Sequence, residues 1–296
     1  MTDPNIITSK DLAAASIDFV DQFTDGINGL MTALQGVRLV PMASGSIIQT
    51  YKKTVVPASS RTVDEGEEIP LSKVTRTKDQ AYTLSLNDKL RKMTSFESIQ
   101  ALGFDRAITN TDAKLLALAR KDAKSALFNA LDSKATTKIT AGGFQQAVSQ
   151  ALGKLTGIFE DLDGAGQTVV FVNPDDFYSW LGNQQITTQT AFGLTYIKNF
   201  LNSGTIILSA GVKAGTVYAT VNNNLDLYYV AMDGQAGQAF GMTTDASGLI
   251  GVKHSTVDQN LGYQTVIAGG WLFIPENTDG IVASTITPAQ TAVSHH

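Results

Sequence analysis

The sequence predicts an α+β protein in which a few long helices pack with many short strands. Two segments, 104–131 and 144–162, carry apolar residues at helical spacing. The second half of the chain instead alternates short β-rich runs with turns. A length of 296 residues with 43% hydrophobic content can bury one large core or two modest ones, so we expect one or two domains.

The composition of the chain excludes several kinds of protein. The absence of cysteine excludes disulfides, thiolate metal sites and a cysteine nucleophile. A net charge of −5, from 22 basic and 27 acidic residues, gives no overall attraction for phosphates, so we expect no sequence-specific nucleic-acid binding. No apolar run approaches the ~18 residues of a membrane span, and the first residues lack the pattern of a secretion signal. We therefore expect a protein that is made in a cytoplasm and does not contact a membrane.

The N-terminal segment, residues 1–44, predicts an arm that docks on another chain. Its apolar residues lie three, four or seven positions apart, as on one face of a helix: Leu12, Phe19, Phe23, Ile27, Leu30 and Leu34. Gly26 and Gly29 interrupt this face, and each costs about 1 kcal/mol of helix propensity. The segment is therefore expected to break into two pieces or to order only against a partner, with Phe19 and Phe23 as candidate contacts.

Residues 45–93 predict a long two-stranded hairpin. The run 47–56 is β-rich, and in 81–86 larger residues alternate with small polar ones. The segment between them is too polar to form a core of its own. Connections this long are uncommon inside compact domains and are usually functional, so we interpret the segment as the tip of a protruding hairpin. The alternative is a solvated surface loop.

The charged residues of this hairpin predict a contact between copies of the chain. The tip is acidic, with Asp64, Glu65, Glu67 and Glu68. Six basic residues flank it along both stems: Lys52, Lys53, Arg61, Lys73, Arg76 and Lys78. An acidic tip on basic stems is self-complementary, so a neighbouring copy could dock tip against stem in a fixed register. An ordinary solvated hairpin could carry the same charges.

The remaining elements follow in chain order. The helix over 104–131 is predicted to be roughly 40 Å long, enough to form the backbone of an elongated subunit. A second helix is predicted over 144–162, followed by a buried strand over 168–172 and a short helix opened by Pro174. The tail from Thr285 is expected to hang free. Further strands are predicted over 205–208, 217–221, 225–232, 238–242, 250–254 and 270–274.

The histidines and glycines predict no catalytic or cofactor site. His254 is the one internal histidine, because His295 and His296 end the chain and are either native or a tag remnant. No Gly-x-Ser-x-Gly motif accompanies His254, so we expect a hydrogen-bonded histidine on the surface or in a strand. Phosphate-loop and dinucleotide-binding patterns are also missing from the sequence.

The acidic residues predict no catalytic pair and no metal site. Glu67 and Glu68 belong to a loop tip, whereas the paired carboxylates of glycosidases face each other across a cleft. Asp161 and Asp163 begin like a calcium loop, but Val172 occupies the position of its last acidic ligand.

Taken in order, these elements resemble the major capsid proteins of tailed bacteriophages, the Hong Kong 97-type fold. The resemblance covers most of the chain and depends on four features: the hairpin around 63–70, the return strand into Met93 and Thr94, the helix entered at Gly103-Phe104-Asp105, and the run 170–174 before a short helix. It implies five segments: an N-terminal arm over 1–44, an extended loop over 45–93, a peripheral domain with a spine helix over 94–140 and 266–290, an axial domain over 141–265, and a disordered tail over 291–296.

The resemblance also implies a function. Members of this family assemble into pentamers and hexamers that form an icosahedral shell around the double-stranded DNA of a tailed phage, and the extended loop lies over the neighbouring subunit's peripheral domain. The chain would then be a structural protein of the virion, made in the host bacterial cytoplasm, without enzymatic activity or cofactor. Its implied partners are further copies of itself, scaffolding and portal proteins, and decoration proteins. DNA would be enclosed without sequence-specific contacts.

Two alternatives remain open from the sequence. An encapsulin-like shell around an enzyme cargo would have the same fold. The many short strands in the second half would also suit a carbohydrate-binding or hydrolytic β domain.

Overall fold

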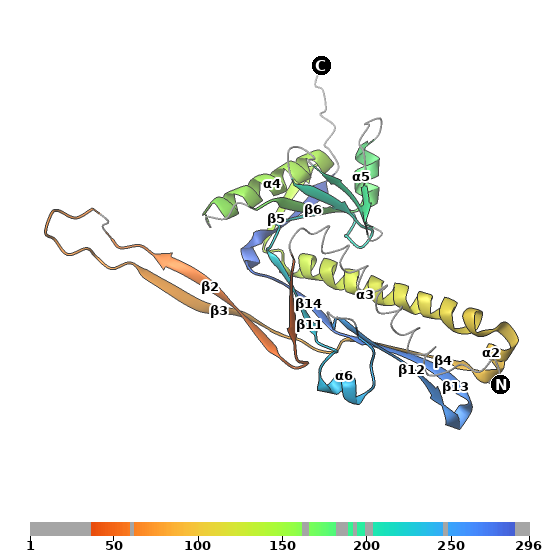
Figure 1. Ribbon diagram of the computed structural model, residues 1–296. Coiled ribbons are helices and arrows are strands. Elements are labelled where there is room, and N and C mark those ends of the chain that lie inside the picture. The colour runs from red at the N-terminus through yellow and green to blue at the C-terminus, as the bar shows by residue number, and fades with distance from the viewer. Residues whose placement is uncertain are drawn as a thin grey trace, which may run out of the picture.

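The computed structural model describes residues 37–59, 62–161, 166–181, 189–191, 194–198, 204–244 and 248–287. These residues form an elongated body from which one two-stranded hairpin projects (Figure 1). Helices and sheets pack together throughout the body, so the predicted α+β class is confirmed. Three predicted contact residues, Phe19, Phe23 and Arg61, lie outside the described residues, as does the tail over 291–296.

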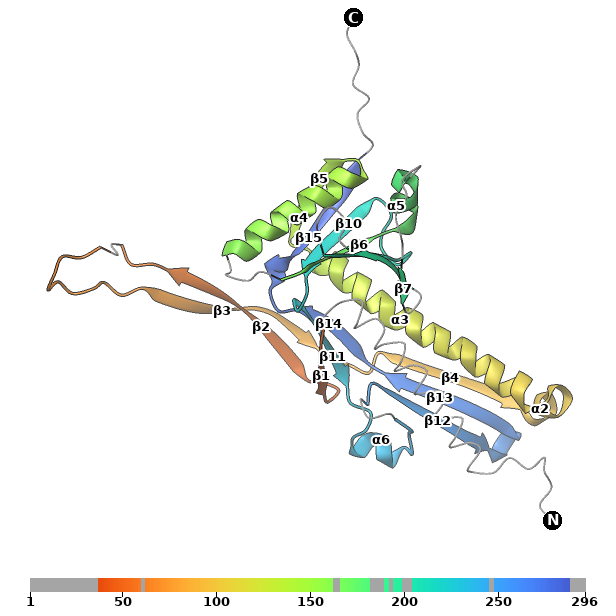
Figure 2. The same ribbon diagram turned by 45° about the horizontal axis from the view of Figure 1, so that its top comes forward.

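A helix lying on a sheet forms one end of the body (Figure 2). The helix, α3 (Asn110–Lys134), buries Leu116, Ala119, Ala123, Leu127 and Leu131 at the spacing that predicted it. The chain enters α3 through α2, which was not predicted, and through a single π-helical turn at the start of the helix predicted over 104–131. The elements of this end are α2 (Phe96–Leu102), η1 (Asp105–Thr109) and a three-stranded antiparallel sheet of β12 (Ile250–Val257), β13 (Gly262–Gly269) and β4 (Asp88–Ser95).

A mixed seven-stranded sheet forms the other end of the body. Its order is β5-β15-β10-β6-β9-β8-β7. Helix α4 (Phe144–Asp161) packs against it, and α5 (Pro174–Leu181) follows β6 as predicted. Buried apolar side chains between α4, α5 and the sheet form a separate core. The strands are β5 (Thr137–Gly142), β6 (Thr168–Val172), β7 (Gln189–Ala191), β8 (Leu194–Lys198), β9 (Thr205–Leu208), β10 (Thr216–Val221) and β15 (Ile281–Thr287).

A small sheet joins the two ends. Strand β1 (Arg38–Met42) pairs in parallel with β11 (Leu225–Val230), and β11 pairs in antiparallel with β14 (Trp271–Pro275). The largest apolar core runs without interruption from α3 through β11 and β14 to β6. Because this core is continuous, the two ends are held together as one unit.

The sheets cross the expected boundary between the peripheral and axial segments. Strand β12 lies within the expected axial segment 141–265, but it pairs with β13 beside α3. Strand β15 lies within the expected peripheral segment 266–290, but it pairs with β10 and β5 in the seven-stranded sheet. The chain therefore passes several times between the two ends of the body.

Two local predictions were wrong. Residues 238–242 were expected to form a strand, but α6 (Gln235–Ala239) is a short helix followed by Gly241 in a left-handed conformation (φ 62°). The stretch contains no β-branched residue that would favour a strand. The tail was expected to hang free from Thr285, but β15 continues to Thr287 because these last residues pair with β5.

The predicted hairpin is confirmed, and it projects away from the body (Figures 1 and 2). Strand β2 (Ile47–Val56) pairs in antiparallel with β3 (Lys73–Thr83), with a register shift between Gln49 and Tyr51. At the base of the hairpin, the Gly45 N–H donates to the carbonyl of Leu84 and the Leu84 N–H donates to the carbonyl of Ser46. Leu84 itself is fully buried, so the ribbon is anchored where it leaves the body.

Candidate functional site

The hairpin is exposed on both of its faces. Large apolar side chains lie open to solvent along it, including Val55, Val56, Val74, Ile69 and Leu71. A two-stranded hairpin without a covering layer is marginally stable in water. Large exposed apolar residues gathered on one element indicate a surface that another molecule covers.

The hairpin register divides the predicted stem cations between the two faces. Side chains alternate along a strand, so cross-strand partners share a face. One face carries Lys53 opposite Arg76 and Tyr51 opposite Lys78, and the Arg76 guanidinium lies 3.8 Å from the centre of the Tyr51 ring. The other face carries three further pairs: Lys52 opposite Thr77, Thr54 opposite Thr75, and Val56 opposite Lys73. Each face of the stem is therefore basic.

The predicted acidic tip is fully open to solvent. Asp64, Glu65, Glu67 and Glu68 are all exposed, and the tip turns at Gly66, where φ is 91°. Within the part of the chain that the structure describes, no ion pair joins these carboxylates to the basic stem. Their charges are therefore available to another molecule.

Two contacts fix the direction of the hairpin relative to the body. Lys52 Nζ lies 2.6 Å from a carboxylate oxygen of Asp279, in the turn before β15. Lys134, at the end of α3, donates to the carbonyl of Phe273 and places Nζ 4.1 Å from the centre of the Tyr82 ring. Burial lowers the pKa of Lys134 to about 8. Of the described stem cations predicted as contacts, Lys52 is the one paired with the body.

An apolar groove, which the sequence did not predict, lies beside the hairpin base. Three methionines from separate segments, Met42, Met232 and Met242, line it together with Val230 and Ala268. We call it the methionine groove. Phe240 and Lys89 also line it, and Phe240 exposes 67% of its surface. Its volume is about 940 Å³. Methionine side chains adapt to different apolar partners, so the groove is suited to binding another apolar surface.

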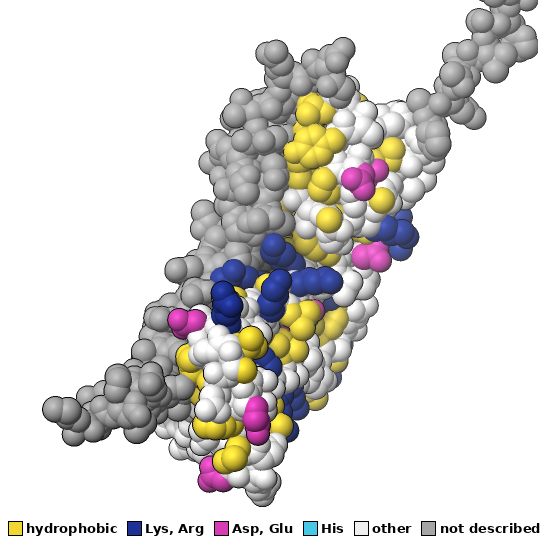
Figure 3. Space-filling view, turned by 90° about the vertical axis from the view of Figure 1, so that its right-hand side faces the viewer, with side chains coloured by type: hydrophobic (Ala, Val, Ile, Leu, Met, Phe, Trp, Pro, Cys, Tyr) yellow, Lys and Arg dark blue, Asp and Glu magenta, His cyan; other side chains and the backbone are white. Residues whose placement is uncertain are grey.

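A second concentration of cations lies on α3 and the turn before it. Arg106, Lys114 and Lys121 are exposed, and Arg120 and Lys124 are half-buried. Burial, together with the charge of Arg120, lowers the pKa of Lys124. Figure 3, which views this end of the molecule, shows Lys and Arg side chains gathered between two areas of hydrophobic side chains.

The internal histidine lies in a strand and contacts a carboxylate. The side chain of His254 on β12 is buried, with Nε2 3.0 Å from Asp112 Oδ2. The other carboxylate oxygen of Asp112 lies 2.6 Å from Lys92 Nζ and accepts from the Thr265 hydroxyl at 2.9 Å. The Tyr263 ring stacks on the imidazole. This cluster joins α3 to all three strands of the sheet beside it.

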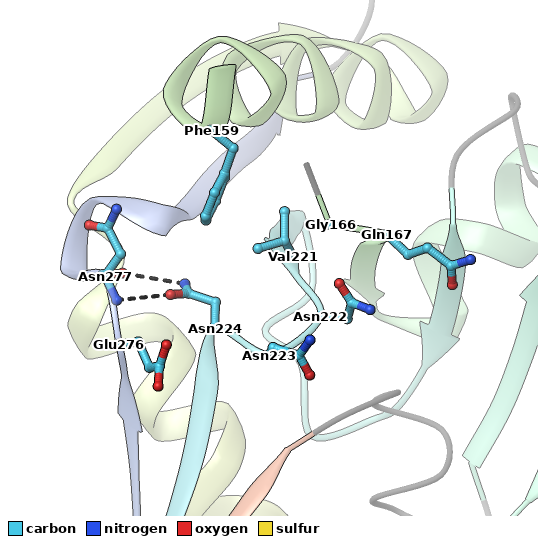
Figure 4. Close-up of a pocket in the computed structure, with 9 residues that line it drawn as sticks. All are labelled: Phe159, Gly166, Gln167, Val221, Asn222, Asn223, Asn224, Glu276 and Asn277. Carbon is cyan, nitrogen blue, oxygen red and sulfur yellow. Dashed lines mark hydrogen bonds between the residues drawn. The ribbon is translucent and has the colours of Figure 1, made fainter. Parts of the chain in front are cut away.

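A polar pocket of about 650 Å³ opens where the turn between β10 and β11 meets α4 (Figure 4). Its lining is mostly carboxamides, including Asn222 and Asn223, and Asn224 and Asn277 hydrogen-bond to each other. Its one carboxylate, Glu276, lies 3.3 Å from the Arg38 guanidinium. Among the described residues that line it, none pairs a nucleophile with a base.

The described residues also bear on metal binding and membrane insertion. They contain no group of three His, Asp or Glu side chains placed to hold a metal ion. None of the helices among them has the length and apolar character to cross a membrane.

Comparison by sequence finds no matching family model and no matching curated protein. Comparison by structure gives clear likenesses. The virus-like particle of Pyrococcus furiosus superposes over 93% of this chain and 98% of its own, with a TM-score of 0.55 and 13% identity. The mature capsid of bacteriophage PhiM1 superposes over 87% and 86%, with a TM-score of 0.57 and 11% identity. The chain has the Hong Kong 97-type capsid fold.

The Hong Kong 97-type fold confirms the predicted fold class and the resemblance. It is not restricted to viral capsids, because the SrpI encapsulin of Synechococcus elongatus superposes over 88% of each chain, with a TM-score of 0.57 and 10% identity. At these identities the likeness concerns the fold alone. Among the described residues, the hairpin exposes both of its faces and its acidic tip, and the methionine groove lies beside its base.

Proposed function

We propose that this chain is the subunit of a closed protein shell that copies of it build without chemical catalysis. The observation that carries the proposal is the hairpin: both faces and the tip are exposed on a chain with a capsid fold. Such a ribbon gains stability when a neighbouring copy covers it, since burial stabilises by about 25 cal/mol for each Å² of apolar surface.

The proposed assembly is a set of rings. The hairpin of one copy and the surface that receives it are different, so the contact is head-to-tail and closes by rotation. Pentamers and hexamers are the proposed rings, and together they form the icosahedral shell. The proposed contacts between copies are the stem cations Lys53, Arg61, Lys73, Arg76 and Lys78, together with Phe19 and Phe23 of the arm.

We propose that the shell is the head of a tailed phage and encloses double-stranded DNA. The likeness to a phage mature capsid supports this proposal. The net charge of −5 supports DNA that is enclosed without sequence-specific contacts. Scaffolding, portal and decoration proteins are the proposed further partners, and the virion is the proposed location of a chain made in the bacterial cytoplasm.

An encapsulin-like compartment is the second candidate, favoured by the likeness to the SrpI encapsulin. The contents of purified particles distinguish the two candidates: DNA supports the phage head, and a packaged protein supports the compartment. A carbohydrate-binding β domain has no such support, because the strands of the second half belong to the sheets of this one fold.

The shell proposal is tested by removing the hairpin tip. Replacement of residues 57–72 by a short turn leaves the anchored base and the body intact, so we expect a folded protein with an unchanged circular dichroism spectrum. Sedimentation should show particles for the full chain and only small species for the shortened chain. Particles of the same size from both chains would contradict the proposal.

A further inference from the structure

The hairpin tip carries an exposed apolar segment. Ile69 and Leu71 expose 71% and 92% of their surfaces on either side of Pro70. Burying a large aliphatic side chain stabilises by about 1.5–3 kcal/mol. Glu67 and Glu68 come immediately before these residues, so the tip presents negative charge beside apolar surface.

The methionine groove has the complementary chemistry. Its apolar lining is bordered by Lys89, which is exposed at the start of β4. Lys253 Nζ extends toward Gly241, next to Phe240 at the same groove. Apolar surface and positive charge therefore occur together.

The open face of the sheet of β12, β13 and β4 extends this positive charge. Lys92 and His254 point toward Asp112 on α3, so their neighbours Arg91 and Lys253 point to the opposite face. In the register, both Arg91 and Lys253 pair with Val266, which lines the methionine groove. The groove is thus flanked by three cations on the side of the sheet away from α3.

The tip cannot reach the groove of its own chain. The groove is lined by Ser44, which lies beside the hairpin base. The ten residues of β2, at about 3.3 Å each, carry the tip about 33 Å away from that base. Figures 1 and 2 show the hairpin projecting away from α6, which borders the groove. A tip that occupies a groove must therefore belong to a second copy.

We propose that the hairpin tip of one copy docks in the methionine groove of a second copy. Ile69 and Leu71 pack on the methionines, and the acidic residues of the tip face Lys89, Arg91 and Lys253. This inference rests on the proposed shell function and adds to it the surface that receives the hairpin.

Charge reversal tests the electrostatic half of the contact. The tip variant carries Glu67→Lys and Glu68→Lys, and the groove variant carries Lys89→Glu and Arg91→Glu. Each should raise the protein concentration needed for particle formation at least tenfold, and their combination in one chain should restore most of the loss. The matched control, Lys114→Glu with Lys121→Glu, reverses two cations on α3 and should leave assembly unchanged.

Crosslinking tests the position of the tip directly, because the chain has no native cysteine. Leu71→Cys with Phe240→Cys, treated with a short bismaleimide, should give a ladder of linked subunits on a denaturing gel. Leu71→Cys with Leu118→Cys is the control, since Leu118 is exposed on α3 and lies away from the groove. Either single cysteine variant should give no ladder.

The outcomes separate this inference from the shell proposal. Both proposals are supported if the native chain forms particles, Leu71→Cys with Phe240→Cys gives a ladder, and the combined charge reversal restores assembly. Two results would contradict docking in the methionine groove but not the shell proposal. In the first, particles form and the crosslinked ladder requires Leu118→Cys. In the second, the α3 charge reversal is the only one that blocks assembly. A native chain that forms no particles contradicts the shell, and with it the inference.

Discussion

At the residue scale, Asp112 is the residue that joins the spine helix to the sheet. It is buried, and its two oxygens contact Lys92, His254 and Thr265. Burial raises the pKa of Asp112, but the hydrogen bonds from these three side chains and the charge of Lys92 outweigh burial and hold the pKa below its ordinary value. Asp112 is therefore ionised at neutral pH.

Asp112→Asn should destabilise the fold by about 3 kcal/mol, because it leaves the charge of Lys92 without its carboxylate partner. Urea denaturation at pH 7 measures the change. Asp258→Asn, an exposed acid in the turn between β12 and β13, is the control and should change the free energy of unfolding by less than about 0.5 kcal/mol. Because the pKa of Asp112 is lowered, its contribution should persist at pH 5 and be lost as the pH falls below about 4. Equal losses in both variants would contradict this role.

Asp88 has the opposite dependence on pH. Burial, with a smaller effect of Asp122, raises its pKa to about 6, and its Oδ2 is buried without a hydrogen-bond partner in the described structure. Because the pKa is raised in the folded chain, the contribution of protonated Asp88 to the free energy of unfolding is fully present below the ordinary pKa of 3.8. This contribution is lost as the pH rises through 6. At pH 8, Asp88→Asn should therefore raise the free energy of unfolding by about 2 kcal/mol and unfold at a higher temperature than the native chain. At pH 4 the two should unfold at the same temperature. An advantage that is equal at both pH values would contradict the raised pKa.

At the scale of the element, replacing two glycines by alanine should change the free energy of unfolding in opposite directions. Gly103 ends α2 with a φ of 80°, a conformation that other residues rarely adopt, so Gly103→Ala should cost about 1–3 kcal/mol. Gly153 lies within α4, with no atom near the position of an added Cβ, so Gly153→Ala should stabilise by about 0.5–1 kcal/mol. Thermal unfolding of the two variants side by side measures both effects. The same sign in both variants would show that backbone conformation is not the cause.

The elements with a strong local pattern could be predicted from sequence. The spacing of apolar residues predicted α3 and α4, and the β-rich runs around a polar tip predicted the hairpin. Helix α6 could not be predicted, because a short stretch of small residues has no strong preference. The division of the stem cations between two faces could not be predicted either, since it depends on the register shift between Gln49 and Tyr51.

The methionine groove was missed for a different reason. Met42, Met232 and Met242 come from segments that meet only in the folded chain, so no window of the sequence contains the pattern. The acidic tip, in contrast, was visible because its residues are consecutive. The sequence could therefore indicate one side of the proposed contact between copies, the hairpin tip. It could not indicate the other side, the methionine groove.

At the scale of the whole molecule, one continuous core links the two ends of the body, while the hairpin lies outside it. Such a subunit can pack as a rigid body whose hairpin contacts a neighbouring copy. Several moderate contacts then make a stable shell, because the later contacts in a closed lattice form within one assembly. This multiplicity could take the place of the disulfides that a chain without cysteine cannot form.

The charge of the whole chain predicts weak binding to DNA. With a net charge of −5, the chain should bind DNA without sequence preference and release it at about 0.2 M salt, because only a few phosphate contacts are expected. Fluorescence anisotropy with two unrelated duplexes at low and moderate salt measures this. Binding that distinguishes the duplexes, or that persists in salt, would contradict a role limited to enclosing DNA.

The central claim is that copies of this chain close into a shell, and electron microscopy of the purified native protein tests it most directly. We expect closed particles of uniform size in which pentameric and hexameric rings are resolved, with each hairpin lying on a neighbouring copy. A protein that stays monomeric at high concentration, with neither rings nor shells in the micrographs, would contradict it.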